Sequence, residues 1–178
     1  MRFYADYGIV AFAALLLVAF LRSRHRNDLT AIAGSLWAGA AALIALGVGQ
    51  LIGNAVDRAR PYETLTGVHV LIDRTTDFSF PSDHATTVGA VAVGLLLVER
   101  RLGLIAIVAA VAMAFTRVYV GAHYPLDVLA GLVLGGTVAL AGARLVVPPL
   151  TRTLQRLTAS RAGIIVRTAH GKLVDGGH

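Results

Sequence analysis

The sequence has no cysteine and few charged residues. The absence of cysteine excludes disulfide bonds and cysteine-bound zinc, and it leaves the redox compartment undetermined. Only 15% of the 178 residues are charged, against about a quarter in soluble domains, while 56% are hydrophobic and the mean hydropathy is +0.71. This composition argues against a soluble protein, and the length allows one compact domain.

Acidic residues are scarce, with 10 Asp and Glu against 16 Lys and Arg, so the formal net charge is +6. A basic excess can indicate nucleic-acid binding. Here, however, the basic residues lie in loops that flank apolar runs, which is where membrane topology places them. We therefore expect contacts with membrane lipids and none with nucleic acid.

Five apolar runs predict an all-α fold, a polytopic membrane helix bundle with about five transmembrane helices. A helix needs about 20 residues to cross the bilayer core. The second, fourth and fifth runs are long enough, the first is marginal and the third is short. The first run lacks an obvious cleavage site, so we expect it to remain as a helix. The runs cover residues 5–21, 30–53, 85–98, 102–120 and 125–147.

Two glycine pairs have a spacing that favours close helix packing. Gly49 and Gly53 lie four residues apart, as do Gly131 and Gly135. Small residues at this spacing let the backbones of membrane helices approach closely. We interpret both pairs as packing positions without a chemical role.

Basic residues are distributed unevenly over the two sides of the expected bundle. The side with the loops at 22–26 and 100–101 and the C-terminal segment carries 11 of the 16 Lys and Arg. Cytoplasmic loops are enriched in Lys and Arg, so this side is expected to be cytoplasmic and the loop 54–83 to face outward. We therefore expect a membrane-embedded domain at 1–150 and a basic cytoplasmic tail at 151–178.

Three polar clusters interrupt the apolar sequence. Such residues are costly beside hydrocarbon unless they face one another or a polar cavity. Arginines bind phosphate oxygens in a forked geometry. One histidine can attack phosphorus, another can protonate the leaving oxygen, and a carboxylate can orient the attacker. The pattern thus indicates a phosphatase site for a lipid phosphate. The clusters are Arg60-Pro61, Pro81-Ser82-Asp83-His84, and Thr116-Arg117 with His123 and Asp127.

Helical rise places these clusters at one depth. His84, Arg117 and Asp127 lie 15, 16 and 17 residues from the basic ends of their helices. At about 1.5 Å per residue these separations are roughly 22, 24 and 26 Å, in a bilayer core about 30 Å thick. Arg60 enters at the same level from the loop after the second helix. We therefore expect one outward-facing site.

Each residue also has a structural explanation of its own. Ser82 or Asp83 can cap the third helix. Pro125 suits the first turn of the fifth helix, which leaves Asp127 one turn in, where its carboxylate can reach the His123 imidazole. A solvated loop is the ordinary expectation for Asp57, Arg58, Asp73, Arg74 and Asp77. The shared depth and the shared chemistry favour a site over these separate explanations.

At these residues the sequence resembles the type 2 phosphatidic acid phosphatase superfamily. That family has the motifs Lys-x6-Arg-Pro, Pro-Ser-Gly-His and Ser-Arg-x5-His-x3-Asp. Here Asp83 replaces the glycine of the second motif and Thr116 the serine of the third. The resemblance spans about residues 46–134. It is strongest to the bacitracin-resistance type of undecaprenyl-diphosphate phosphatase, enzymes that return the spent lipid carrier of cell-wall synthesis to its monophosphate at the outer membrane face.

The resemblance implies a role for each site residue. His123 is expected to attack the terminal phosphorus and form a phosphohistidine, with Asp127 as its hydrogen-bond partner. His84 is expected to protonate the leaving oxygen and then to activate water. No metal or cofactor is expected, because arginines supply the positive charge. The phosphate-binding groups are expected to be Arg60, Arg117, Ser82 and the backbone amide of Asp83.

The sequence departs from the family in two places. The lysine of the first motif falls at Gly53, and Arg58 is the cation that we expect to substitute for it. The family core usually has six helices against the five expected here, so an N-terminal helix is absent, truncated or replaced.

The substrate and the class of protein have alternatives. Undecaprenyl diphosphate at the outer face of the plasma membrane is the first expectation. Phosphatidate, phosphatidylglycerol phosphate and a prenyl-phosphosugar also carry a phosphate on a lipid tail. A non-enzymatic lipid-phosphate-binding protein would need neither histidine, so the histidine pair disfavours it. The oligomeric state is open, a homo-oligomer included.

Overall fold

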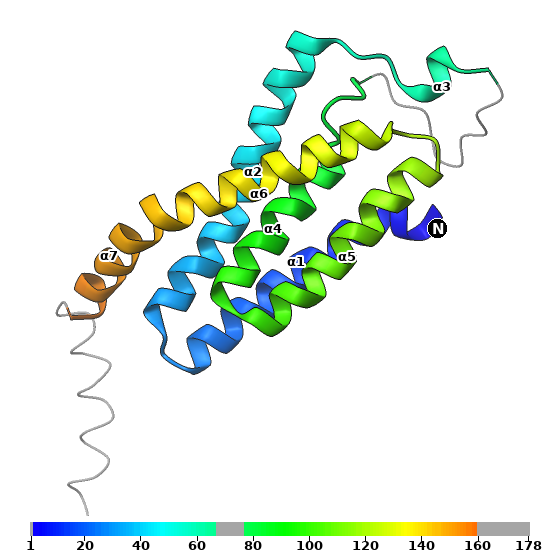
Figure 1. Ribbon diagram of the computed structural model, residues 1–178. Coiled ribbons are helices and arrows are strands. Elements are labelled where there is room, and N and C mark those ends of the chain that lie inside the picture. Colours follow the sequence, from blue (N-terminus) through cyan, green and yellow to red (C-terminus); the bar gives the residue numbers. More distant parts are fainter. Residues whose placement is uncertain (1, 67–76, 160–178) are drawn as a thin grey trace, which may run out of the picture.

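A computed structural model of the chain describes residues 2–66 and 77–159, and this part is all-α, as predicted (Figure 1). The loop residues Asp73 and Arg74 and the segment 160–178 lie outside the described residues. The helices are α1 (Arg2–His25), α2 (Leu29–Val56), α3 (Pro61–Thr64), α4 (Asp83–Val98), α5 (Arg100–Tyr119), α6 (Pro125–Leu145) and α7 (Val147–Ala159).

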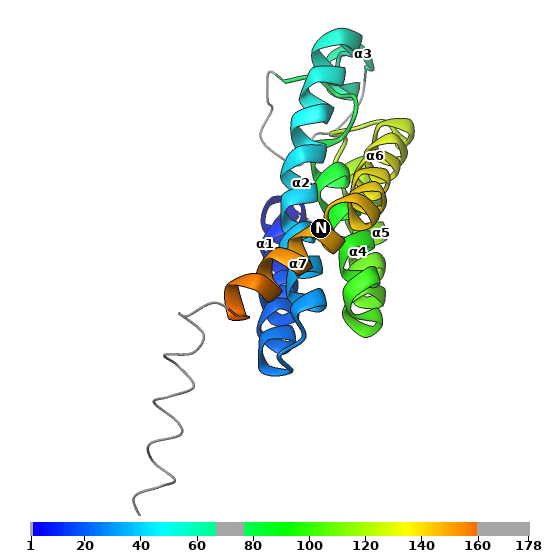
Figure 2. The same ribbon diagram turned by 90° about the vertical axis from the view of Figure 1, so that its left-hand side faces the viewer.

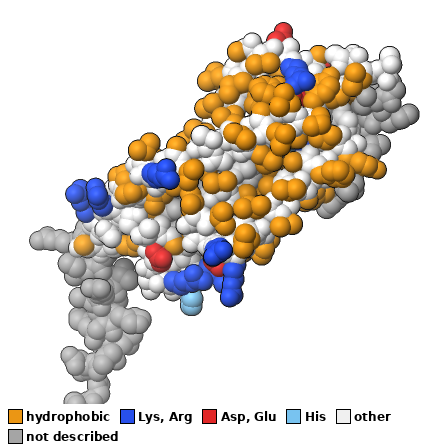
Figure 3. All heavy atoms as spheres, in the orientation of Figure 1, with side chains coloured by type: hydrophobic (Ala, Val, Ile, Leu, Met, Phe, Trp, Pro, Cys, Tyr) orange, Lys and Arg blue, Asp and Glu red, His pale blue; other side chains and the backbone are white. Residues whose placement is uncertain are grey.

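In the described part of the chain, four helices are long and apolar enough to cross a membrane: α1, α2, α5 and α6. The shorter apolar helix α4 has 16 residues. These five correspond to the five apolar runs, so the predicted bundle is confirmed. Large hydrophobic side chains such as Leu43, Val108 and Val133 are exposed on its outer surface, and Figure 3 shows how densely apolar side chains cover one face. The chain is a multi-pass membrane protein.

Helix α4 occupies the centre of the bundle and packs against α2, α5 and α6 (Figures 1 and 2). Glycines permit its close approach to α6. A Cβ atom on Gly135 would lie 2.0 Å from the carbonyl oxygen of Thr86, and one on Gly131 would lie 2.7 Å from the carbonyl oxygen of Ser82. The Gly131/Gly135 pair therefore acts in packing, as expected, and the contact brings the start of α4 beside the first turns of α6.

Substitution of Gly135 by alanine is expected to destabilise the bundle by about 1–3 kcal/mol, because the added methyl group meets backbone atoms that cannot move aside. Thermal unfolding in detergent measures the effect. Gly47→Ala is the matched control, since a Cβ there meets nothing within 4 Å. Equal melting temperatures for the two variants would contradict the packing role of Gly135.

The basic end of the bundle is tied together by ion pairs. Arg22 lies 3.0 Å and Arg26 3.9 Å from the carboxylate of Glu99. The α1–α2 and α4–α5 connections therefore share one end, as the charge distribution predicts. Asp28 begins α2 by accepting hydrogen bonds from the first backbone amides of the helix. Helix α7 starts beyond α6, and residues 151–159 of the predicted tail are helical.

Candidate active site

Three connecting segments meet at the other end of the bundle. They are the residues after α2 (57–60), the segment before α4 (77–82) and the α5–α6 connection (120–124). Backbone hydrogen bonds join them: the amide of Ser79 donates to Arg58, and that of Ser82 donates to Asp127. The polar clusters, far apart in sequence, thus lie together, as the helical-rise argument predicts.

His123 is buried, with 3% of its surface exposed, and its ring is held in one orientation. Its Nδ1 lies 2.8 Å from the carbonyl oxygen of Ser79. A carbonyl oxygen only accepts, so Nδ1 carries the proton and Nε2 keeps its lone pair. Nε2 faces the guanidinium of Arg60, 3.3 Å from Nη1. The nearer carboxylate oxygen of Asp127 is 4.0 Å from Nδ1. The hydrogen bond expected from His123 to Asp127 is therefore made to Ser79 instead.

Asp127 is fully buried and supports the same ring indirectly. Its carboxylate accepts hydrogen bonds from the hydroxyl of Ser79 and, at 2.9 Å, from the amide of Tyr124, which precedes α6. Pro125 occupies the first turn of α6, as expected. Asp127 therefore fixes both the segment that holds His123 and the serine whose carbonyl binds its Nδ1. No pattern of side chains in the sequence pointed to Ser79, because its contact with His123 uses a backbone atom.

Arg58 is part of this network, so the expectation of a solvated loop is wrong for it. Its Nη1 lies 2.7 Å from Oδ1 of Asp127. Its guanidinium also stacks 4.3 Å above the ring of Tyr124. About a third of the Arg58 side chain is exposed (35%), whereas Asp127 is not exposed. Asp57, by contrast, is an exposed C-cap of α2, as a loop residue would be.

Position 53, where the lysine of the first family motif would fall, packs against other residues of the protein. A Cβ atom on Gly53 would lie 3.2 Å from the carbonyl oxygen of Phe80 and 3.5 Å from the ring of Phe78. The segment before α4 thus packs directly against the glycine. A lysine stem would require this segment to move, which is a physical reason for glycine here.

Arg60 is a buried cation, 4% exposed, held by the neighbouring segments. It donates to the carbonyl oxygens of Asp77 and Ala122, both at 3.1 Å. Its Nη2 also lies 2.9 Å from the carboxylate of Asp77, an exposed loop residue, as expected, that also pairs with this buried arginine. These contacts present the guanidinium to His123 in a fixed position.

The start of α4 does not have the cap that we expected. Ser82 occupies the N-cap position without a side-chain hydrogen bond to the helix. Its Oγ is buried and has no hydrogen-bond partner in the described part of the chain. The Asp83 carboxylate accepts from Nε2 of Gln50 at 2.7 Å. Most buried hydroxyls are hydrogen-bonded, so the Ser82 hydroxyl is available to a ligand at this helix N-terminus.

The second histidine and the second arginine complete the group. His84 is half-buried in the first turn of α4, and Arg117 is buried near the end of α5. Arg60 and Arg117 lie close enough for their positive charges to interact electrostatically with the rings of both His84 and His123. The two histidines are also close enough to interact with each other. The site thus brings together the three predicted catalytic side chains, His84, His123 and Asp127, and the three predicted phosphate-binding arginines, Arg58, Arg60 and Arg117.

Burial, together with the charges of Arg60 and Arg117, lowers the pKa of His123 to about 3 from its ordinary value of 6.5. The ring therefore stays neutral well below pH 6.5, and its Nε2 lone pair stays available. Among residues 2–66 and 77–159, no group of three or more His, Asp or Glu side chains is arranged to hold a metal ion.

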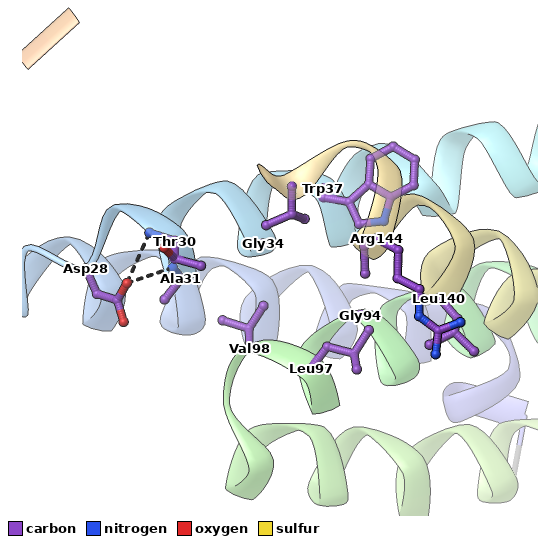
Figure 4. Close-up of a pocket in the computed structure, with 12 residues that line it drawn as sticks. Asp28, Thr30, Ala31, Gly34, Trp37, Gly94, Leu97, Val98, Leu140 and Arg144 are labelled. Carbon is purple, nitrogen blue, oxygen red and sulfur yellow. Dashed lines mark hydrogen bonds between the residues drawn. The ribbon is translucent and has the colours of Figure 1, made fainter. Parts of the chain in front are cut away.

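A cavity of about 340 Å³ lies at the basic end of the bundle, away from these residues (Figure 4). Asp28 lies at one end of its lining and Arg144 at the other, with Trp37 and Val98 between them. Asp28 is engaged with two backbone amides. The cavity has no histidine and no paired arginines, so it lacks the groups for phosphoryl transfer.

A membrane helix bundle with two arginines, two histidines and a buried carboxylate at one end is suited to binding and transferring a phosphate group. The PAP2 superfamily matches residues 34–149, and the chain belongs to this family of membrane phosphatases. The resemblance noted from the motifs is thereby confirmed.

Individual relatives match different shares of the chain. It is 35% identical to the undecaprenyl-diphosphatase BcrC of Bacillus subtilis over 75% of this chain and 67% of that protein. It is 42% identical to a decaprenylphosphoryl-5-phosphoribose phosphatase of Mycobacterium tuberculosis, over 58% and 56%. A PAP2 type phosphatidylglycerolphosphate phosphatase from Bacillus subtilis is 24% identical, with a TM-score of 0.44 over 74% and 72%. The chain spans about two thirds of the length of the curated relatives that cover most of it.

Proposed function

We propose that this protein hydrolyses a lipid diphosphate at the outer face of the plasma membrane, converting undecaprenyl diphosphate to undecaprenyl phosphate. The observation that carries the proposal is a buried, neutral His123 whose Nε2 faces the guanidinium of Arg60. A neutral imidazole is the nucleophilic form, and the guanidinium beside it binds the phosphate that it attacks. Similarity to the undecaprenyl-diphosphatase BcrC supports the choice of substrate.

The first step forms a bond between His123 Nε2 and the terminal phosphorus. The bond from that phosphorus to the bridging oxygen breaks, and the lipid monophosphate leaves. His84 donates a proton to the leaving oxygen. In the second step His84 takes a proton from water, the water oxygen attacks phosphorus, and the P–N bond to His123 breaks. Inorganic phosphate leaves and the enzyme is restored.

Groups around His123 stabilise the negative charge on the phosphate oxygens during the transfer. Arg60 and Arg117 bind the phosphate oxygens, and the hydroxyl of Ser82 and the amide of Asp83 donate hydrogen bonds at the start of α4. These donors are fixed before substrate arrives, so little reorganisation is needed. Because arginines supply the positive charge in this scheme, we expect the protein to keep full activity in EDTA.

Arg58 has a different role from the phosphate ligand suggested by its sequence position. Its guanidinium is paired with Asp127, so we assign it as a positioning residue for the Asp127–Ser79–His123 chain. Arg58→Gln is expected to lower kcat about tenfold with little change in KM. A hydrogen bond between charged groups contributes about 1.5–3 kcal/mol, and the exposure of Arg58 reduces that value by solvent screening.

Steady-state kinetics on the purified protein test this role, with Arg58→Lys as the conservative variant that restores part of kcat. Arg156→Gln, on α7 at the other end of the bundle, is the matched control. An increase in KM at constant kcat would instead identify Arg58 as a direct phosphate ligand.

The pKa of His123 predicts the pH dependence of the first step. With p-nitrophenyl phosphate, whose leaving group needs no acid, the single-turnover rate is expected to stay level from pH 8 through 6.5, because His123 stays neutral down to about 3. Arg117→Gln removes a neighbouring positive charge, which raises the pKa of His123 and moves its acid limb to higher pH. A wild-type rate that halves near pH 6.5 would contradict the assignment.

The orientation follows from charge. The site lies at the end of the bundle opposite the Arg22–Glu99 contact and the start of α7. Cytoplasmic loops carry the excess of Lys and Arg, which supports a site on the outer side. Labelling of a cysteine introduced at Glu63, beside the site, by a membrane-impermeant reagent on intact cells tests this. Labelling only after lysis would reverse the orientation.

The substrate is tested by phosphate release from undecaprenyl diphosphate and phosphatidate at matched concentration, with EDTA present. We expect a clear preference for the diphosphate. A prenyl-phosphosugar is a third arm, because the 42% identical relative is named as a decaprenylphosphoryl-5-phosphoribose phosphatase. Preference for phosphatidate or for the phosphosugar would keep the site and change the substrate. Absence of release from all three would favour a lipid-phosphate-binding protein.

A further inference from the structure

Helices α5 and α6 enclose an apolar groove on the side of the bundle, next to the candidate active site. The two helices meet near the loop that joins them, and α4 packs against both (Figure 1). Between residues 111–118 of α5 and 125–132 of α6 lies a hollow of about 450 Å³ whose lining side chains are all apolar. We call it the tail groove. Its walls include the exposed side chains of Phe115 and Leu129 (59% and 57%).

The floor of the tail groove packs against the start of α4, beside the site. Ala85, Ala114 and Val128 form one buried apolar cluster beneath it. Ala85 directly follows His84, and Ala114 lies one helical turn from Arg117. At the upper end of the groove, Pro125 is two residues from His123. The end of the groove nearest the α5–α6 loop is therefore the end nearest the reacting groups.

The apolar lining of the groove and its position beside the site indicate the chemistry of a ligand that would fit there. A ligand with a phosphate at Arg60 and His123 and a hydrocarbon chain beyond it matches the polar site above and the apolar groove below. Small residues such as Ala114 in the floor leave room for the chain, and burying hydrocarbon between Phe115 and Leu129 is favourable. Residues 111–118 cover roughly 10 Å of helix, so the groove holds only the part of the chain nearest the phosphate.

We propose that the tail groove binds the first part of the prenyl tail of the substrate and so selects for a lipid-linked diphosphate. This inference rests on the proposed function and adds the residues that recognise the tail. The rest of a long tail lies in the bilayer beyond residue 111. The groove therefore distinguishes substrates by their first prenyl units. Because the groove contacts no reacting atom, we expect this selectivity to change KM and not kcat.

The test compares farnesyl diphosphate, whose tail reaches the groove, with isopentenyl diphosphate, whose tail is too short to fill it. Phe115→Ala removes an exposed wall without disturbing the core, and Ala114→Leu fills the floor. Both are expected to raise KM for farnesyl diphosphate about tenfold, the loss equivalent to about two buried methylene groups. We expect kcat for farnesyl diphosphate, and both constants for isopentenyl diphosphate, to stay unchanged.

Val108→Ala and Ala112→Leu are the matched controls, because they make similar changes at exposed positions of α5 outside the groove. They are expected to leave KM unchanged for both substrates. Equal effects of the groove variants on both substrates would overturn the proposal, as would no effect on either. If the wild-type protein released phosphate from neither compound, nor from undecaprenyl diphosphate, the proposed function would fail and this inference with it.

Discussion

Replacement of His123 by alanine is expected to lower phosphate release from undecaprenyl diphosphate by about 10⁴-fold or more. The variant loses the atom that bonds to phosphorus, and direct attack by water lacks a positioned nucleophile. His84 cannot take over, because it lies in the first turn of α4, and the carbonyl of Ser79 holds only the His123 ring in place. Steady-state release of inorganic phosphate in detergent measures the loss.

The matched control for this variant is His25→Ala, at the exposed end of α1 on the opposite side of the bundle. It is expected to retain wild-type activity and melting temperature. The His123→Ala protein should also remain folded, since its ring contacts a backbone carbonyl that the Asp127 network fixes independently. Activity within tenfold of wild type would show that another group attacks phosphorus.

Replacement of His84 by alanine is expected to lower turnover by about 10²–10⁴-fold, the usual contribution of a general acid or base. Both chemical steps lose their proton-transfer group. With p-nitrophenyl phosphate the first step no longer needs an acid, so only the attack of water on the phosphoenzyme stays slow. The expected result is a burst of about one nitrophenolate per active site, followed by slow turnover.

The double variant His84→Ala/His123→Ala separates this mechanism from general damage to the site. It should show neither the burst nor the slow turnover, because the acceptor of the phosphoryl group is gone. Linear product formation without a burst in His84→Ala alone would mean that His84 acts before, and not after, phosphoryl transfer.

Much of the fold and the co-location of the site could be predicted because both depend on simple geometry. A chain that is 56% hydrophobic with few charges has to bury or face hydrocarbon, so apolar runs become helices. On such helices the rise per residue converts sequence separation into depth. The rise predicts one depth in the membrane for His84, Arg117 and Asp127. In the structure these residues lie in one group with Arg60.

The connections within that group could not be predicted, because they depend on how loops fold against one another. Ser79 binds His123 through a backbone carbonyl, which any residue could supply. Arg58 and Asp127 are 69 residues apart, and their pairing depends on the positions of α2 and α6. Ser82 resembled a helix cap in the sequence, yet its hydroxyl is buried without a bond to the helix.

The departure from the family lysine is explained in part by packing. Gly53 lies against Phe78 and Phe80, so the segment before α4 occupies the space beside it. Arg58 brings a positive charge to the site five residues later, but it does so through Asp127. In the proposed mechanism, Arg60 and Arg117 are therefore the two cations that bind the phosphate.

The central claim is that His123 carries the phosphoryl group during turnover. It is tested most directly by rapid acid-free quenching of His84→Ala with undecaprenyl diphosphate labelled in its terminal phosphate, followed by peptide mapping. We expect label on the peptide that contains His123, stable to base and labile to acid, and absent from His84→Ala/His123→Ala. Phosphate release without label on this peptide, or label on another residue, would contradict the account.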